Sequence, residues 1–593
     1  MPHLALPTLT AYLRRKGLTV IQRDLNAEVY DYFLSKPALE NALARVRQDY
    51  GPAGNRRPVR RALPEPEIVI RALTHGPDLI QKVEQAKQVF KSEAFYDGAA
   101  CREAFFILVE SLALASLPYY PSSLDFSEFN SAQRVDSSTR LLQAVRDPAF
   151  NPFLEYFRNG ILKDIEREQP DIVGISIPTM GQFLAGMTIA SLIKKAGLKC
   201  HVTVGGPHIT MLREQLPRAP QVFSLIDSAV VGAGEVALLR LAQALEFPGE
   251  SQPDFSNVPN LIYRQDSEQQ RWVVNVNQPD HSLDHRVRGA SEDDPQDELP
   301  DFDGLDLERY LAPERVLPLM TAHGCYHGKC AFCNVGYGWD NSYRQLQAER
   351  IVDQMLALHE KYGTRHIFFA DEAITPKNLR QMSRLLAEKG DPIHWCGCTR
   401  FERSLSKDIL ESLEKGGCRM LLFGLETASV PIVEAMEKGT QVETMGRILL
   451  ESTTAGIWNH TFFFFGFPGE TIENAQDTVN FLYEHKHAIH SASPGTFLLE
   501  RYAPAHLYPD QFGVKRIIEH PERDLAIYFD FEVVSGMNEE MAEQVVASFL
   551  SVLPQKSFGQ YYITDVYKLL YSSRLHDEGI RFPPWLVPET EPH

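Results

Sequence analysis

Three of the eight cysteines in this 593-residue chain lie in the stretch GCYHGKCAFC, where four and two residues separate Cys325, Cys330 and Cys333. Thiolates are soft ligands, which select zinc, copper(I) or iron–sulfur clusters. So few cysteines in a long chain favour thiols and metal ligands over a disulfide framework. We therefore expect this loop to hold a metal ion or a metal cluster.

The cysteine spacing alone leaves more than one kind of site open. A structural zinc site needs four ligands, so His323 or His327 would have to complete a Cys3His set. The C-x4-C-x2-C spacing also occurs in plant-type ferredoxins, which use a fourth cysteine. Here the next cysteine, Cys396, follows 63 residues later. Both alternatives leave features of the sequence unexplained, because no second zinc knuckle follows and the next cysteine is distant.

Length and charge narrow the class of protein. A chain of 593 residues is too long for one core, so two to four domains are expected. The net charge of −19 argues against a nucleic-acid partner, which usually requires a cationic surface. No apolar run approaches the roughly 18 residues of a membrane span, and the first residues lack the layout of a signal peptide. We expect a cytoplasmic protein without a membrane partner.

The residues that follow the cysteine loop alternate between strand and helix patterns. Six β/α units fit between residues 305 and 504, which predicts a partial parallel barrel of the TIM type. The last predicted strand is GTFLLERYA, residues 495–503. Active sites of such barrels lie at the carboxyl ends of the strands. The charged residues predicted at these ends are Glu372, Arg400, Glu426 and Glu470.

The N-terminal half predicts a second parallel sheet. Helix patterns at 7–17 and 181–197 alternate with strand patterns at 18–26, 170–179, 198–208 and 224–235. This alternation predicts a doubly wound, Rossmann-like α/β domain, which binds ligands at the carboxyl ends of its strands. Small residues at these ends allow close approach to the backbone. They are Ser176, Gly205, Gly206, Gly232 and Gly234, and Glu235 completes the last motif.

Composition divides the chain into four predicted parts. A polar turn between two alternating segments at 260–276 predicts a hairpin that closes the first domain. The predicted parts are an N-terminal domain at 1–280 with a helical insertion at 36–150, an acidic linker at 281–304, the barrel at 305–504, and a helical C-terminal cap at 505–593 that includes HPERDLAIYFDFEV.

With these motifs in place, the chain resembles the cobalamin-binding radical S-adenosylmethionine (SAM) enzymes. The strand ends GIS, VGGPH and VGAGE occur in the order of the cobalamin-binding domain, and DE, R, GLE and GFPGET in the order of the radical SAM barrel. Four features depart from the family pattern. The first cysteine gap has one extra residue, Ala233 interrupts the usual GEGE, no DxHxxG is present, and Met1 begins at the first helix, without the usual preceding strand.

The resemblance implies cofactors and contacts. Cys325, Cys330 and Cys333 would hold a [4Fe–4S] cluster whose fourth iron binds SAM. Glu372 would bind the SAM amino group, Arg400 and Glu426 its carboxylate or ribose, and Phe332 would lie beside it. Glu470 is expected at a helix N-terminus instead of on the ligand. Ser176, Gly205, Gly206, Gly232, Gly234 and Glu235 would contact cobalamin.

The implied function is methylation of an unactivated carbon in a small-molecule or peptide substrate, through a 5′-deoxyadenosyl radical and methylcobalamin. An electron donor such as flavodoxin or ferredoxin would reduce the cluster. No catalytic residue is assigned beyond the cofactor contacts. Two alternatives stay open: a cobalamin-assisted cyclisation or rearrangement without methyl transfer, and a non-catalytic protein that binds an iron–sulfur cluster and cobalamin.

The remaining cysteines are expected in cores. Cys101, Cys200 and Cys418 lie in apolar segments, where a buried thiol behaves as a small hydrophobic group. Cys396 and Cys398 are two residues apart on a predicted strand and therefore share one face. If that face lines the barrel, one of them is placed to contact substrate.

Overall fold

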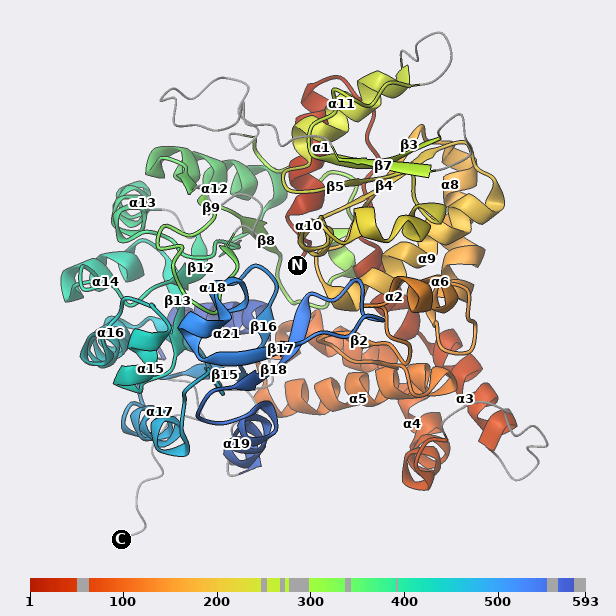
Figure 1. Cartoon of the computed structure of the whole chain (residues 1–593). Coiled ribbons are helices and arrows are strands. Elements are labelled where there is room, and N and C mark those ends of the chain that lie inside the picture. Colours follow the sequence, from red (N-terminus) through yellow and green to blue (C-terminus); the bar gives the residue numbers. More distant parts are fainter. Residues whose placement is uncertain are drawn as a thin grey trace.

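The computed structural model describes residues 1–50, 63–246, 253–266, 272–276, 298–335, 343–390, 393–551 and 564–580. Figure 1 places an N-terminal sheet beside a C-terminal barrel, with the helices of the insertion below the sheet. The predicted α/β class with two parallel sheets is confirmed. No helix among these residues is long and apolar enough to cross a lipid bilayer.

The N-terminal sheet has the strand order β3-β4-β5-β6-β7. Strands β3, β4 and β5 are parallel, whereas β6 and β7 form the predicted antiparallel hairpin. The strands are β3 Ile172–Ser176, β4 His201–Gly205, β5 Ser228–Val230, β6 Leu261–Asp266 and β7 Trp272–Val276. The helices between and before them are α1 Ala5–Arg15, α9 Met180–Ala196, α10 Pro207–Met211 and α11 Glu235–Glu246.

The predicted strand at residues 18–26 is wrong. Residues 18–24 form no strand, and α2 begins at Leu25. A strand requires a neighbour to pair with, and among the described residues β3 pairs on one side only, with β4. A large cavity lies between β3 and residues 18–24. The segment is held instead by side chains, since Thr10 donates to Gln22 and Gln22 donates to the Asp301 carbonyl at 2.7 Å.

The insertion is helical, as its periodicity predicts. Helices α3, α4 and α5 pack against one another through apolar faces and form the lower right of Figure 1. The helices are α2 Leu25–Phe33, α3 Lys36–Tyr50, α4 Pro66–Phe90, α5 Gly98–Ser116, α6 Ser138–Ala144, α7 Phe153–Tyr156 and α8 Leu162–Glu168, and the short strands β1 Ser123–Leu124 and β2 Phe129–Asn130 pair with each other.

The barrel is a parallel sheet of order β15-β14-β13-β12-β11-β8. Its strands are β8 Val316–Leu319, β11 His366–Phe369, β12 His394–Thr399, β13 Cys418–Glu426, β14 Trp458–Phe465 and β15 Ser491–Thr496. Its helices are α12 Ala348–Tyr362, α13 Pro376–Lys389, α14 Lys407–Lys415, α15 Val430–Ala435, α16 Val442–Ala455 and α17 Ile472–Glu484. The short strands β9 Ala322–His323 and β10 Arg344–Gln345 pair beside the cysteine loop. The six predicted β/α units are therefore confirmed.

The sixth strand differs in position from its prediction. It ends at Thr496, whereas the prediction placed it at 495–503. Residues Leu499–Glu500 form β16, which pairs with β18 outside the barrel. Only Phe497 and Leu498 separate the two strands, so the apolar sequence pattern did not divide them.

The C-terminal part is a mixed cap. Its helices are α18 Pro504–Leu507, α19 Glu539–Ser551 and α21 Asp565–Asp577, and its strands are β17 Val514–Ile518 and β18 Tyr528–Val533. The prediction that HPERDLAIYFDFEV is helical is wrong where β18 forms. In YFDFEV aromatic and acidic residues alternate, which is the period of a strand. Helix α21 returns beneath the barrel, where Leu569 and Leu570 join the apolar core of the lumen.

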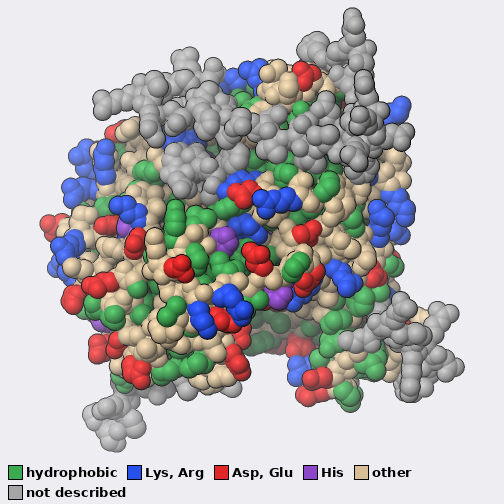
Figure 2. Space-filling view, viewed as in Figure 1, with side chains coloured by type: hydrophobic (Ala, Val, Ile, Leu, Met, Phe, Trp, Pro, Cys, Tyr) green, Lys and Arg blue, Asp and Glu red, His purple; other side chains and the backbone are tan. Residues whose placement is uncertain are grey.

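Charged contacts join the two halves of the molecule. Asp301 accepts hydrogen bonds from Arg14 of α1 at 2.8 Å and from Lys361 of α12 at 3.1 Å. Of the acidic linker predicted at 281–304, residues 281–297 lie outside the described residues. On the face shown in Figure 2, acidic and basic side chains are interspersed over the described surface.

Candidate functional site

The cysteine loop begins at the end of β8, where one buried carboxylate fixes the backbone. Asp371 accepts hydrogen bonds from the Thr321 amide at 2.9 Å and the Thr321 hydroxyl at 2.6 Å. Burial raises the pKa of Asp371 to about 7, although these bonds act in the opposite direction. The loop therefore leaves the barrel at a defined point beside the end of β11.

Backbone hydrogen bonds hold the middle of the loop from two sides. The Ala331 amide donates to the Met436 carbonyl at 2.8 Å, and the Ala505 amide donates to the Ala331 carbonyl at 2.9 Å. A ring nitrogen of His327 lies 2.9 Å from the Glu437 carbonyl. The segment after α15 and the first turn of the cap thus position the cysteines.

The sulfur atoms of Cys325, Cys330 and Cys333 do not all lie within 4.8 Å of one another. Three thiolates on one tetrahedral zinc ion would lie about 3.8 Å apart, because the Zn–S bond is about 2.3 Å. The observed spacing is therefore too wide for a mononuclear zinc site. A multinuclear iron–sulfur cluster, which cysteine thiolates bind, accommodates a wider set.

Arg400, at the end of β12, lies against the cysteine loop. Its Nη1 is 3.8 Å from the Cys330 sulfur, and Nη2 donates to the Lys438 carbonyl. Its Nε forms an ion pair with Glu402 at 3.1 Å. The guanidinium group is thus close to the predicted cluster and is held by a local ion pair.

Glu426, at the end of β13, is held in the left-handed region with φ +60°. Lys438 Nζ lies 2.8 Å from its Oε1, and the two side chains are only 5% and 13% exposed. The ammonium group also lies 5.7 Å from the ring of Phe332. Glu426 therefore pairs with Lys438 and not with Arg400. No sequence motif pointed to Lys438, because it lies in a loop past the strand end.

Two acidic residues from other strands, Glu372 and Glu500, lie close enough for their charges to interact. Glu372 follows β11 and is exposed to the large cavity, and the surrounding protein raises its pKa by desolvation. Glu500 in β16 has a pKa raised to about 7, first by burial and further by the charge of Glu372, while an Asn334 hydrogen bond lowers it. Sequence analysis missed Glu500 because it placed β16 inside the sixth strand.

The predicted cobalamin contacts lie at one edge of the N-terminal sheet. Ser176, Gly205, Gly206, Gly232, Gly234 and Glu235 all line one cavity of about 2570 Å³. The barrel residues Thr321, Gly324 and Glu372 line the same cavity. The cavity thus joins the carboxyl ends of the N-terminal strands to those of β8 and β11, as the rule for parallel sheets predicts. The three cysteines, Arg400 and Glu426 are not among the described residues that line it.

Two glycines in the cavity wall adopt conformations or close backbone contacts that a side chain would disturb. Gly206 has φ +102°, and a Cβ there would lie 2.8 Å from the Ile177 carbonyl oxygen. The Gly232 amide donates to the Thr210 hydroxyl at 2.9 Å, which fixes the next turn. The Ser176 hydroxyl is buried without a hydrogen-bond partner. A wall of bare backbone with an unpaired hydroxyl fits a large polar ligand such as cobalamin.

Direct contacts link the two cofactor regions. Asn334, just past the last cysteine, donates to the Met211 sulfur of α10 at 3.1 Å. The Arg213 guanidinium lies 3.6 Å from the ring centre of Tyr502, in the turn before the cap. The residue after the cysteine loop therefore packs on the sheet domain that carries VGGPH.

The two neighbouring cysteines of β12 lie on the lumen side of the barrel. Cys396 is fully buried and Cys398 is half-buried. Burial raises the pKa of both thiols, and the charge of Glu372 adds to the effect at Cys398. A role for either thiol toward substrate stays a prediction.

Each half of the chain matches a known family of domains. A model of the B12 binding domain matches residues 145–242, and one of the radical SAM superfamily matches residues 319–482. The chain combines a B12-binding domain with a radical SAM domain. This combination confirms the predicted cofactors: a [4Fe–4S] cluster, SAM and cobalamin.

Curated relatives of the two domains include methyltransferases and a cyclase. An uncharacterized methyltransferase of Pyrococcus horikoshii is 28% identical over 54% of this chain and 66% of its own length. Cytidylyl-2-hydroxyethylphosphonate methyltransferase of Streptomyces wedmorensis is 26% identical over 30% of this chain and 34% of its own length. Anaerobic magnesium-protoporphyrin IX monomethyl ester cyclase of Rubrivivax gelatinosus is 25% identical over 55% of this chain and 57% of its own length. The chain thus spans less than two thirds of each of these relatives.

Solved structures show the same fold for the B12-binding and radical SAM domains together. The radical SAM methyltransferase TsrM from Kitasatospora setae superimposes with a TM-score of 0.52 at 16% identity, covering 72% of this chain and 92% of its own. The cobalamin-dependent radical SAM enzyme OxsB gives a TM-score of 0.51 at 18% identity, and the match covers 71% of this chain and 64% of OxsB.

Glu470 closes the turn after β14 of the radical SAM domain. It precedes Thr471, the N-cap of α17, so it lies just outside the first helical turn where it was expected. Its Oε2 accepts a hydrogen bond from the Gly466 amide at 2.5 Å, and the side chain is fully buried. Burial raises its pKa to about 7.

This raised pKa predicts a pH dependence of stability. The folded state binds the Glu470 proton more tightly than the unfolded state, so the free energy of unfolding should fall as pH rises from about 4.5 to about 7, by at most about 3 kcal/mol. The substitution Glu470→Gln should remove this part of the slope in urea unfolding at about pH 5 and about pH 8. The exposed Glu443→Gln should leave the slope unchanged. Equal slopes for wild type and Glu470→Gln would contradict the assignment.

Proposed function

We propose that this chain is a cobalamin-dependent radical SAM methyltransferase that acts on an unactivated carbon of a small-molecule or peptide substrate. One observation carries the proposal: the glycine edge of the B12-binding domain and the strand ends of the radical SAM domain line one cavity. An enzyme that uses two cofactors on one substrate carbon must place both against it. A shared cavity meets this requirement.

When bound, the cluster and SAM supply a 5′-deoxyadenosyl radical, and cobalamin supplies the methyl group. The protein residues hold and orient these groups. Cys325, Cys330 and Cys333 bind the cluster, and Arg400 lies 3.8 Å from the Cys330 sulfur, where its charge stabilises a thiolate. The loop geometry is set by the backbone bonds from Met436 and Ala505.

SAM carries a positive ammonium group and a negative carboxylate, and the site offers both signs of charge. Glu372 lies at the cavity with its pKa raised by desolvation, so pairing with an ammonium group stabilises its charged form. Arg400 and Lys438 provide the cationic side, and Phe332 supplies an apolar surface next to Lys438. Glu426, already paired with Lys438, presents its remaining oxygen to ribose hydroxyl groups.

Cobalamin is assigned to the glycine edge. Gly205 and Gly206 allow the ligand to approach the backbone, and Ser176 offers a free hydroxyl. The sequence contains no DxHxxG motif. The residues of the glycine edge would therefore hold cobalamin without a histidine supplied by that motif.

A cyclisation or rearrangement is the second candidate. It is favoured by the cyclase of Rubrivivax gelatinosus, which matches as much of this chain as the Pyrococcus methyltransferase does. The two reactions differ in the fate of the SAM methyl group. Methyl-labelled SAM, given with a reductant such as flavodoxin or ferredoxin and a candidate substrate, separates them: label in the product supports methylation, and an unlabelled rearranged product supports the second candidate.

The substitution Cys330→Ala should abolish the reductive cleavage of SAM, because the cluster loses one of three ligands. The measurement is 5′-deoxyadenosine formed anaerobically with dithionite. Cys101→Ala is a matched control, since this buried thiol lies in α5, away from the site. SAM cleavage retained in Cys330→Ala would overturn the assignment of the cluster to this loop.

The substitution Gly206→Ala should weaken cobalamin binding, because a Cβ at this position would lie 2.8 Å from the Ile177 carbonyl oxygen and φ is +102°. We expect at least a tenfold higher dissociation constant, which corresponds to about 1.4 kcal/mol. Binding is measured by absorbance titration. Gly160→Ala is the control, because nothing lies within 4 Å of its Cβ. Wild-type affinity in Gly206→Ala would argue that cobalamin does not contact this edge.

A further inference from the structure

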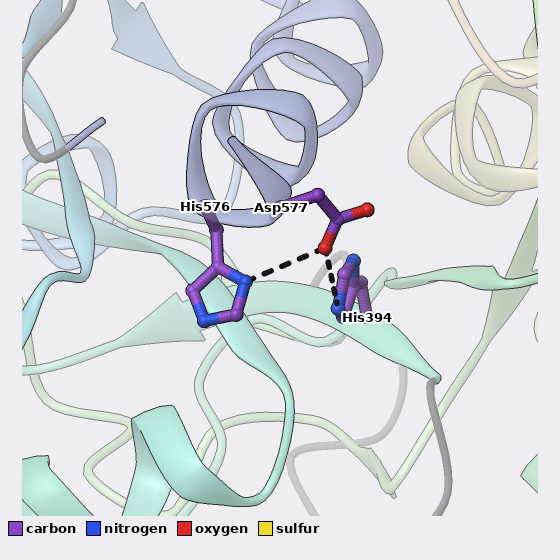
Figure 3. A group of neighbouring side chains, drawn as sticks. All are labelled: His394, His576 and Asp577. Atoms are coloured by element: carbon purple, nitrogen blue, oxygen red, sulfur yellow. Dashed lines mark hydrogen bonds and ion pairs between the residues drawn. The ribbon is translucent and has the colours of Figure 1, made fainter. Parts of the chain in front are cut away.

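A second group of metal-ligating side chains lies at the opposite end of the barrel. His394 is the first residue of β12, and His576 and Asp577 are the last residues of α21. Figure 3 shows both imidazole rings directed at the same carboxylate. This end carries the amino termini of the strands, so the group is separate from the cavity that holds the predicted cofactors.

The distances in this group are short and converge on one atom. Asp577 Oδ1 lies 3.8 Å from His394 Nε2 and 3.5 Å from His576 Nδ1. All three ligand atoms lie within 4.8 Å of one another. In a tetrahedral zinc site with bonds of about 2.0 to 2.1 Å, ligand atoms lie about 3.3 Å apart. Small side-chain movements therefore bring these atoms to zinc geometry.

Ser573 holds the inner nitrogen of His394. Its hydroxyl oxygen lies 2.5 Å from His394 Nδ1 and 2.9 Å from His366 Nε2. His366 Nδ1 lies 3.6 Å from Glu314 Oε2 and is buried without a hydrogen-bond partner. When His394 Nδ1 donates to the Ser573 hydroxyl, His394 Nε2 carries a lone pair that faces Asp577.

The second histidine has the same arrangement. His576 Nε2 lies 2.9 Å from Glu414 Oε1, and a carboxylate can only accept, so this nitrogen carries the proton. His576 Nδ1 then directs a lone pair at Asp577 Oδ1. In the neutral tautomer that donates to Glu414, the lone pairs of both histidines and the Asp577 carboxylate face one space. All three atoms attract a cation placed in that space.

Charged neighbours orient this group. Arg365 Nη2 lies 3.4 Å from the other Asp577 oxygen, Oδ2, which turns Oδ1 toward the histidines. Arg419 Nη1 lies 3.7 Å from Glu414 Oε1. The carboxylates of Glu314, Glu414 and Asp577 outnumber these two guanidinium groups. The net charge of this cluster is therefore negative, which favours binding of a divalent cation despite the neighbouring arginines.

We propose that His394 Nε2, His576 Nδ1 and Asp577 Oδ1 bind a zinc ion. Zinc accepts imidazole and carboxylate ligands, and its histidine ligands usually donate their other nitrogen to a carboxylate or hydroxyl group, as both do here. The side chains of His576 and Asp577 are 35% and 39% exposed, so a water molecule can take the fourth position. The ion ties the C-terminal helix α21 to strand β12.

This zinc site has a structural consequence for the barrel. Helix α21 places Leu569 and Leu570 in the core under the lumen, and both are fully buried. In its last turn Leu575 is also buried in this core, and Ser573 lies against His366 and His394 at the starts of β11 and β12. Zinc at this point fastens the helix that forms the floor of the barrel.

The test uses the full chain with its cluster and cobalamin reconstituted, so that Cys325, Cys330 and Cys333 are occupied. After incubation with zinc chloride and gel filtration, wild type should retain one zinc per chain. The zinc K-edge absorption spectrum should show a first shell of nitrogen and oxygen without sulfur. A sulfur shell, or no retained zinc, overturns the proposal.

Matched variants locate the ion. His576→Gln and Asp577→Asn should each lose the retained zinc. His520→Gln and Asp530→Asn should keep it, because this pair, 2.9 Å apart, is not part of any described group of three ligand atoms within 4.8 Å of one another. Cobalamin and iron content report whether each variant has folded. Zinc retained in folded His576→Gln and Asp577→Asn overturns the proposal.

A milder variant covers the case in which the ligand variants do not fold. Glu414→Gln keeps both zinc-binding histidines and removes only the carboxylate that orients His576. We expect zinc affinity to fall about 10- to 100-fold, measured by competition with a chelating dye. Unchanged affinity would show that zinc, if retained, is bound elsewhere.

Discussion

The carboxyl ends of two parallel sheets face one cavity, and most of the molecule follows from this constraint. Ligands of parallel sheets bind at these ends, and the residues after β3, β4 and β5 line one cavity with those after β8 and β11. The contacts between Asn334 and Met211 and between Arg213 and Tyr502 lie at this junction. The two domains are thus arranged as one site.

The cysteine loop depends on the rest of the barrel more than on its own sequence. A loop with two glycines at positive φ, Gly324 and Gly328, has no fixed shape by itself. Its position comes from Asp371 at one end and from the Met436 and Ala505 backbone in the middle. Inside the first gap, Tyr326 donates to Glu402 at 3.1 Å and a His327 ring nitrogen lies 2.9 Å from the Glu437 carbonyl. The longer gap is therefore held by contacts of its own in addition to these anchors.

Much of the architecture follows from sequence periodicity, including six barrel strands, the closing hairpin and the helical insertion. The errors have physical causes. Residues 18–24 have a strand pattern but no partner strand. Residues 499–500, predicted inside the sixth barrel strand, form β16, which pairs with β18 in a segment predicted to be helical. Glu372, Arg400 and Glu426 follow or end strands as predicted, and their roles stay predictions. Lys438 and Glu500 carried no sequence signal, because a loop and a pairing between distant segments bring them near these residues.

The C-terminal segment has a larger part in the barrel than a peripheral cap would have. Six strands do not close a barrel, so its lumen needs other elements to exclude water. Leu569 and Leu570 of α21 fill the amino end, and β16, β17 and β18 cover the carboxyl side next to the cysteine loop. The same segment both seals the barrel and positions Glu500 beside Glu372, which makes it the part of the chain best placed to select the substrate.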